Sequence, residues 1–159
     1  MVEFLRRRLV EPVLALLRQG LAPRELALCL ALGTGIGLFP VLGVSTPLLA
    51  AIALFRRLNL AAIQLVNYLI YPLQLLLIIP FVRLGEAVTG AAPQPLTVSA
   101  GLELMSQGVW QAVVTLWDAI VHATLGWTLI GPAGIYVMYR LLEPALRRAS
   151  QKLTSGNAP

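Results

Sequence analysis

The fold of this chain is decided by residues 26–55, which read LALCLALGTGIGLFPVLGVSTPLLAAIALF. The segment contains no charged residue, and it is longer than the roughly 20 apolar residues that cross a bilayer as a helix. Its centre, from Pro40 to Pro47, holds two prolines and Gly43, and a straight helix does not continue through them. We therefore expect two short helices, Leu26–Leu38 and Pro47–Phe55, with Ser45 or Thr46 capping the second.

The composition of the whole chain indicates a membrane protein. Of 159 residues, 58% are hydrophobic and only 12% are charged, whereas a soluble domain has about a quarter of its residues charged. Two further apolar segments, Leu60–Val82 and Ala119–Tyr139, are long enough to span a bilayer, and the second is interrupted at Gly131–Gly134. The predicted fold class is an all-α membrane protein with one helical membrane domain over residues 20–152.

Amphipathic segments flank the apolar ones. Residues 1–19 are predicted to form a basic amphipathic helix at the membrane interface. A second amphipathic helix is expected from Ser99, because polar residues recur on one of its faces at helical spacing. The Pro-rich stretch 90–98 reads as a loop and residues 153–159 as a disordered tail.

The distribution of basic residues favours one topology. If residues 26–55 crossed the membrane once, Arg56, Arg57 and the basic C-terminal segment would lie outside. If they form a re-entrant hairpin, both termini are cytoplasmic, and of the 12 basic residues only Arg83 lies outside. The positive-inside rule prefers the second arrangement. A hairpin that crosses the membrane fully gives the same sidedness and remains open. The chain is therefore expected to pass through the membrane several times, with both termini on the cytoplasmic side.

The turn between the two short helices is the first candidate binding site. Pro40 and Gly43 shape the turn, and Ser45 and Thr46 stand where free N–H groups begin the second helix. These groups and the helix dipole favour an anion such as a lipid phosphate or a carboxylate. The alternative is that the two hydroxyls only cap the helix.

Polar residues inside the next apolar segment extend this candidate site. Asn67, Tyr71 and Gln74 recur on one helix face, around Pro72. Polar side chains in a membrane span generally face the interior of the bundle. They would either line a path for a ligand or satisfy backbone groups freed by Pro72 and by the turn.

Two other pairs of residues have a possible role, one in proton coupling and one in helix packing. Asp118 and His122 are one helical turn apart and form a possible proton-coupling pair, or an interfacial ion pair that ends the polar face. Gly33 and Gly37, four residues apart, predict a smooth face on which another helix packs closely. A nucleotide-binding loop is rejected there because no strand or phosphate-loop lysine accompanies the glycines.

Several classes of function are excluded by the residues available. With one histidine, one cysteine and no metal-ligand spacing, the sequence predicts no enzyme, no catalytic residue, no metal site and no cofactor. Nucleic-acid binding is not expected, because no polar or aromatic surface accompanies the arginines. Basic clusters beside apolar segments instead predict contact with the bilayer and its anionic lipid head groups.

The residues from Ala31 to Thr46, ALGTGIGLFPVLGVST, resemble the signature of the bacterial membrane proteins grouped as domain of unknown function 2062. Later parts of the family pattern are also matched, by Arg57–Leu60, by Pro72 and by Arg83–Gly85. The resemblance covers about residues 20–90. It implies a bacterial inner-membrane protein, and it brings no established activity.

The chain departs from the family pattern around Pro72. The family typically has Asn directly before this proline and Thr shortly after it, where this sequence has Tyr71 and Gln74. Asn67, one turn earlier, is a candidate to replace that Asn.

Two functions from different classes follow from these observations. The leading hypothesis is a small inner-membrane protein that binds or translocates a small anionic or lipidic ligand at the broken helix. A homo-oligomer is expected, because one chain of this size has few helices to enclose a path for the ligand. The alternative is a structural or accessory subunit of an envelope complex, with a partner protein and no ligand of its own.

Overall fold

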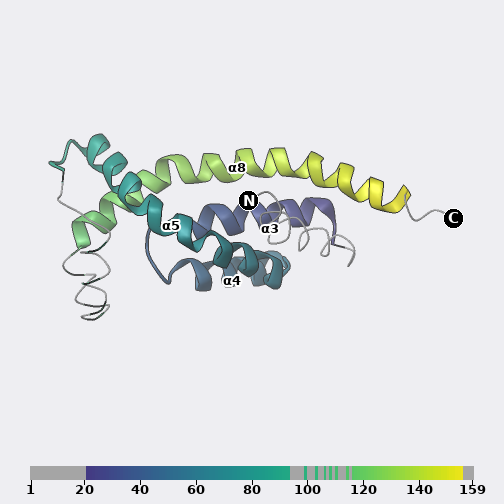
Figure 1. Ribbon diagram of the computed structural model, residues 1–159, viewed down its shortest axis with the longest axis horizontal. Coiled ribbons are helices and arrows are strands. Elements are labelled where there is room, and N and C mark those ends of the chain that lie inside the picture. Colours follow the sequence, from purple (N-terminus) through teal and green to yellow (C-terminus); the bar gives the residue numbers. More distant parts are fainter. Residues whose placement is uncertain are drawn as a thin grey trace.

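A computed structural model describes residues 21–93 and 116–155, together with single positions between 99 and 114. The regular secondary structure of this part is all α-helical, without strands, and its helices are labelled in Figure 1. They are α3 (Pro23–Gly37), α4 (Ser45–Arg56), α5 (Leu60–Thr89) and α8 (Trp117–Ser155). The predicted amphipathic helix 1–19 lies outside the described residues, and the helix expected from Ser99 is described only at isolated positions.

The break in the first apolar segment separates α3 from α4, as predicted. Pro40 is buried in the connection, and Gly43 adopts a φ of 82°, a left-handed conformation that glycine accepts without strain. The predicted cap is wrong. Val44 is the N-cap residue of α4 and makes no side-chain cap, while Ser45 is already the first helical residue. The Thr46 hydroxyl bonds to α5 instead of capping its own helix.

The helix α5 is longer than the predicted span Leu60–Val82. Asn59 caps its start by accepting a hydrogen bond from the Ala62 backbone N–H at 2.8 Å, and Gly90 ends it with a φ of 70°. Pro72 and Pro80 both lie inside the helix. Membrane helices tolerate proline where neighbouring groups satisfy the backbone that it frees.

The helix α8 runs unbroken from Trp117 to Ser155, so the predicted interruption at Gly131–Gly134 is wrong. Pro132 and Pro144 are both helical. A single proline removes one backbone donor, and hydrogen bonds on either side of it hold the helix together. The start of the predicted disordered tail is corrected too, because the helix continues through residue 155.

The helices form a small bundle in which α3 packs against both α5 and α8 (Figure 1). One apolar core surrounds α3 and includes Leu26 and Cys29 together with Leu49 of α4 and Ile63 of α5. A second core joins α5 to α8 through Phe81, Val82, Ala119 and Ala123. The second arm, α4, packs mainly on α5.

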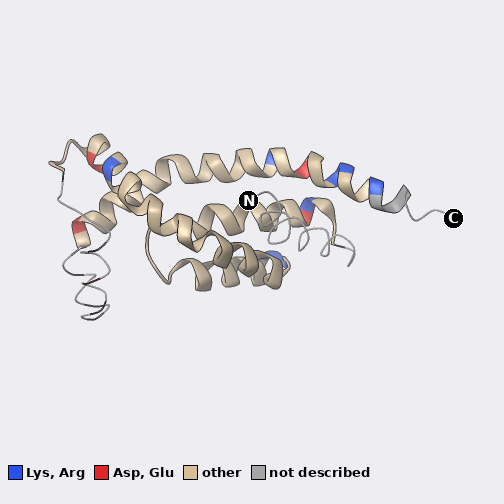
Figure 2. Ribbon diagram, viewed as in Figure 1, with Lys and Arg blue, Asp and Glu red and all other residues tan. Residues whose placement is uncertain are grey.

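Charged residues lie at the two ends of the bundle (Figure 2). One end, which we name the basic end, carries Arg24, Glu25, Arg56, Arg57, Arg140, Glu143, Arg147, Arg148 and Lys152. The other end carries Arg83, Glu86 and Asp118. Between them α8 has no charge from Ala119 to Tyr139, about 31 Å at 1.5 Å per residue, which matches the hydrocarbon core of a bilayer.

Two helices in the described part are long and apolar enough to cross a membrane. They are α5, over Leu60–Thr89, and α8, over Trp117–Lys152. The helix α4 is apolar but short.

Candidate functional site

Hydrogen bonds between amide and hydroxyl side chains attach α4 to α5. Asn67 donates through Nδ2 to the Thr46 hydroxyl at 3.0 Å and to Gln64 Oε1 at 3.2 Å. Gln64 donates in turn through Nε2 to the Thr46 backbone carbonyl at 2.9 Å. Asn67 is only 4% exposed. The predicted ligand-binding residues Thr46 and Asn67 therefore meet, and they bond to each other.

A second amide holds the turn between α3 and α4. Gln74, 1% exposed, donates from Nε2 to the Phe39 backbone carbonyl at 2.6 Å. Phe39 follows Leu38, the C-cap residue of α3, in a region where carbonyl groups lose their helical partners. Gln74 thus satisfies an acceptor that the break in the helix exposes, and a buried unpaired acceptor would cost about 1–3 kcal/mol.

The other residues predicted at this turn have different surroundings. Pro40 and Ser45 are buried, whereas Gly43 is exposed and an added Cβ there would meet no atom within 4 Å. Tyr71 is 46% exposed and does not join the amides of α5. Across the described residues, every buried side-chain nitrogen or oxygen has a hydrogen-bond partner. The turn is thus a set of satisfied polar groups.

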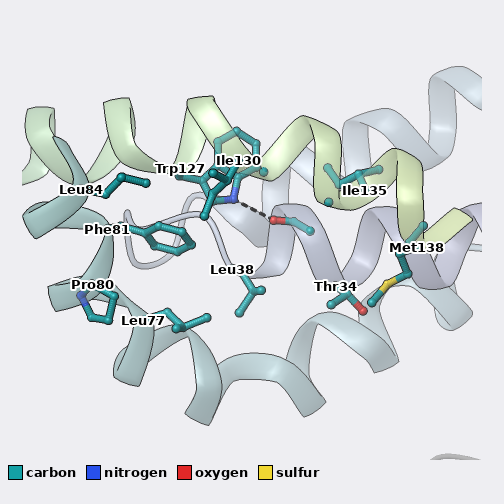
Figure 3. A pocket seen from close by; sticks show the side chains of 14 residues that line it. Thr34, Leu38, Leu77, Pro80, Phe81, Leu84, Trp127, Ile130, Ile135 and Met138 are labelled. Atoms are coloured by element: carbon teal, nitrogen blue, oxygen red, sulfur yellow. Dashed lines mark hydrogen bonds between the residues drawn. The ribbon is translucent and has the colours of Figure 1, made fainter. Parts of the chain in front are cut away.

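An apolar groove of about 510 Å³ lies between α3, α5 and α8 (Figure 3). Its volume falls within the range of small-molecule sites, about 300–1,000 Å³. Thr34 supplies the one side-chain hydroxyl in the lining, which consists of Ala31, Thr34, Gly35, Leu38, Leu77, Pro80, Phe81, Leu84, Trp127, Ile130, Gly131, Gly134, Ile135 and Met138. No charged side chain contributes to it.

Trp127 is the first residue of α8 in the lining of this groove. Its indole Nε1 donates to the Gly35 backbone carbonyl at 3.0 Å, and its ring meets Phe39 edge to face with centroids 5.1 Å apart. Gly131 makes room for the indole, because a Cβ at that position would lie 2.6 Å from the ring. An added Cβ at Gly134 would meet nothing within 4 Å. The glycines that seemed to break α8 therefore shape the groove.

The glycines predicted to pack closely face α5. A Cβ at Gly33 would lie 2.9 Å from the Ile63 carbonyl oxygen, and one at Gly37 would lie 2.6 Å from Ile70 Cγ2. The absence of these side chains lets the backbones of α3 and α5 approach. This contact places α3 as one wall of the groove.

The possible proton-coupling residues Asp118 and His122 lie where α5 and α8 cross. His122 Nδ1 is 2.7 Å from the Asp118 backbone carbonyl oxygen, and His122 Nε2 is 3.0 Å from the Thr89 hydroxyl. Because a carbonyl oxygen only accepts, Nδ1 carries the hydrogen of the first bond. The imidazole thus bonds to the backbone of Asp118 and to the end of α5.

The crossing of α5 and α8 was not expected from the sequence. A Cβ at Gly85 would collide with the His122 carbonyl oxygen, and one at Gly126 with the Phe81 carbonyl oxygen. Ala119, Ala123 and Gly126 form a row of small residues at helical spacing. This pattern typically marks close helix packing in membranes and would have revealed the contact.

Comparison with protein families identifies the chain. The model of one bacterial family, described as an uncharacterized protein conserved in bacteria (DUF2062), matches residues 6–154. The match extends well beyond the residues 20–90 on which the resemblance rested. A search of curated proteins and a search of solved structures gave no match. The chain belongs to the bacterial family of domain of unknown function 2062.

Proposed function

We propose that this protein is a multi-pass protein of the bacterial inner membrane that binds a lipid chain in the groove between α3, α5 and α8. The observation that carries the proposal is the charge-free lining of that groove within the charge-free section of the bundle. An apolar cavity of this size excludes charged solutes, because burying an unpaired charge is too costly. Of the two ligand classes considered, the arrangement favours the lipidic one over a small anion.

The proposed orientation has the basic end in the cytoplasm. Arg24 lies in the first turn of α3 and Arg56 ends α4, so the two arms of the hairpin start and finish at this end, together with the last turns of α8. The tip of the hairpin reaches Trp127 through Phe39. Trp127 lies nine residues, about 14 Å along α8, from Asp118 at the opposite end. A re-entrant hairpin that turns inside the membrane agrees with these positions, and with both termini cytoplasmic.

In this proposal the polar residues at the turn support the groove and do not contact the ligand. The side-chain amide of Asn67 already donates to Thr46 and Gln64, and that of Gln74 donates to the Phe39 carbonyl. Their role is to satisfy a broken backbone at membrane depth, where water does not reach.

Lipid binding is tested by native mass spectrometry. The full chain is purified in a detergent that preserves bound lipid, and the mass of lipid retained on the protein is measured. We expect one retained lipid on the wild-type protein. Gly134→Phe fills the groove from α8, where a new side chain starts without a clash, and should abolish retention. Val137→Phe is the matched control, because Val137 is 54% exposed on the same helix and does not line the groove. Equal retention by both variants would refute the proposal.

The accessory-subunit function has one observation in its favour. Leu129, Tyr136, Val137 and Leu141 leave one side of α8 exposed and apolar along the proposed span. In a membrane this surface contacts lipid, another copy of the chain or an envelope partner. Crosslinking in native membranes distinguishes these outcomes: a single stoichiometric partner, without lipid retained by the purified protein, would favour the accessory function.

A further inference from the structure

The groove has a direction relative to the charges of the bundle. On α8 it extends from Trp127 to Met138, eleven residues, or about 17 Å along the axis. That length is roughly half of the 30 Å hydrocarbon core of a bilayer, and so close to the depth of one leaflet. Arg140 follows Met138 by two residues, so the groove ends beside the basic end. A chain in the groove would therefore belong to a lipid of the leaflet at the basic end.

A row of residues on α3 also runs from the groove toward the basic end. Arg24, Ala31 and Leu38 are spaced by seven residues, which places them in one row on the helix. Ala31 and Leu38 line the groove, and Arg24 stands two turns, about 10 Å, beyond Ala31 toward the basic end. A lipid whose chain follows this row would bring its head group to Arg24.

The Arg24 side chain makes a single hydrogen bond among the described residues. Its Nε donates to the Tyr139 hydroxyl at 3.1 Å. The guanidinium is cationic with or without this bond, because arginine stays protonated in proteins. Within the part of the chain that the structure describes, the two terminal nitrogens of the guanidinium make no hydrogen bond. These nitrogens form the fork that matches a phosphate group.

We infer that the lipid in the groove is an anionic phospholipid, with one acyl chain between α3, α5 and α8 and its phosphate at Arg24. The inference rests on the proposed lipid-binding function and adds the class of head group. Charge complementarity supports it, because the groove leads to the end of the bundle where basic residues outnumber acidic ones (Figure 2). An interfacial basic residue favours an anionic lipid by a free energy that corresponds to about a fivefold preference.

Fluorescence of Trp127 measures the chain in the groove directly. Trp110 and Trp117 are 79% and 58% exposed, so replacing both with Phe leaves Trp127 as the one tryptophan with little disturbance. The full chain in this background is reconstituted in phosphatidylcholine nanodiscs. A minor, equal fraction of brominated phosphatidylglycerol or brominated phosphatidylcholine is then added. Bromine on an acyl chain beside the indole quenches its emission.

We expect brominated phosphatidylglycerol to be about fivefold more effective as a quencher than brominated phosphatidylcholine. Arg24→Gln should remove this preference. Arg148→Gln, which removes an exposed arginine of α8 at the same end, and Tyr139→Phe, which keeps the Arg24 cation, should both retain it. Equal quenching by the two lipids, or an unchanged preference in Arg24→Gln, would overturn the inference.

The failure of this inference is distinguishable from failure of lipid binding itself. Gly134→Phe lies between the basic end and Trp127, and it should reduce quenching by both lipids, whereas Val137→Phe should not. Equal quenching that is still lowered by Gly134→Phe would overturn only the choice of head group. Quenching that Gly134→Phe leaves intact would overturn the proposed function as well.

Discussion

At the scale of single residues, glycine decides where helices approach and where space remains. Gly85 and Gly126 lie at the crossing of α5 and α8, and each faces backbone atoms of the opposite helix. Gly134 faces the groove, and nothing lies within 4 Å of where its Cβ would stand. A larger residue should therefore be tolerated at Gly134 but not at Gly85 or Gly126.

Gly85→Ala should destabilise the protein, because the new methyl group forces two backbones apart. Overpacking of this kind costs about 1–3 kcal/mol. Gly134→Ala is the matched control, and a gain in helix propensity of up to about 1 kcal/mol is expected there. Thermal unfolding in detergent, followed by circular dichroism, measures both. A Gly85→Ala protein as stable as Gly134→Ala would contradict the close crossing.

Gln74→Leu should loosen the turn between α3 and α4. The change leaves the Phe39 carbonyl without its donor, at a cost of about 1–3 kcal/mol. Tyr71→Phe is the control on the same helix, because Tyr71 is half exposed. Hydrogen exchange of residues 38–44 reports the difference. Exchange that is equal in the two variants would show that Gln74 does not hold the turn.

At the scale of elements, the sequence predicted a helix break correctly where proline and glycine interrupt the backbone. It predicted a break wrongly where these residues serve the packing of neighbouring helices. Pro40 and Gly43 correctly separated α3 from α4, because several breakers occur together in the turn. Gly131 and Pro132 look similar in sequence, yet α8 continues through them. There the glycines accommodate Trp127 and leave the groove open, which depends on neighbouring helices that periodicity does not reveal.

The attachment of α4 to α5 should depend on Asn67. Asn67→Ala removes the bond to the Thr46 hydroxyl and the link to Gln64. Each such bond contributes about 0.5–1.5 kcal/mol, so α4 should open more readily while α3, packed against two helices, is unaffected. Hydrogen exchange that rises across Ser45–Arg56 but not across Pro23–Gly37 is the expected result. A uniform rise across both helices would contradict a local role for Asn67.

At the scale of the whole molecule, the candidate site was only partly predictable from sequence. Thr46 and Asn67 were assigned to one candidate site, and the structure joins them by a hydrogen bond. The choice between binding a ligand and satisfying protein groups stayed open, because a pattern of polar residues does not say which partners they bond to. The groove escaped prediction entirely, because it depends on close packing at Gly35 and Gly131 and on the open space beside Gly134.

The central claim is that the hairpin α3–α4 enters the membrane from the basic end, returns to it, and walls the groove. Cysteine accessibility in intact spheroplasts tests this most directly. In a Cys29→Ala background, which removes the one native thiol, single cysteines are introduced as Arg56→Cys, Ala92→Cys and Gln151→Cys, all at exposed positions. We predict that an impermeant maleimide labels only Ala92→Cys from outside, and that it labels the other two after lysis. Labelling of Arg56→Cys from outside would contradict the claim.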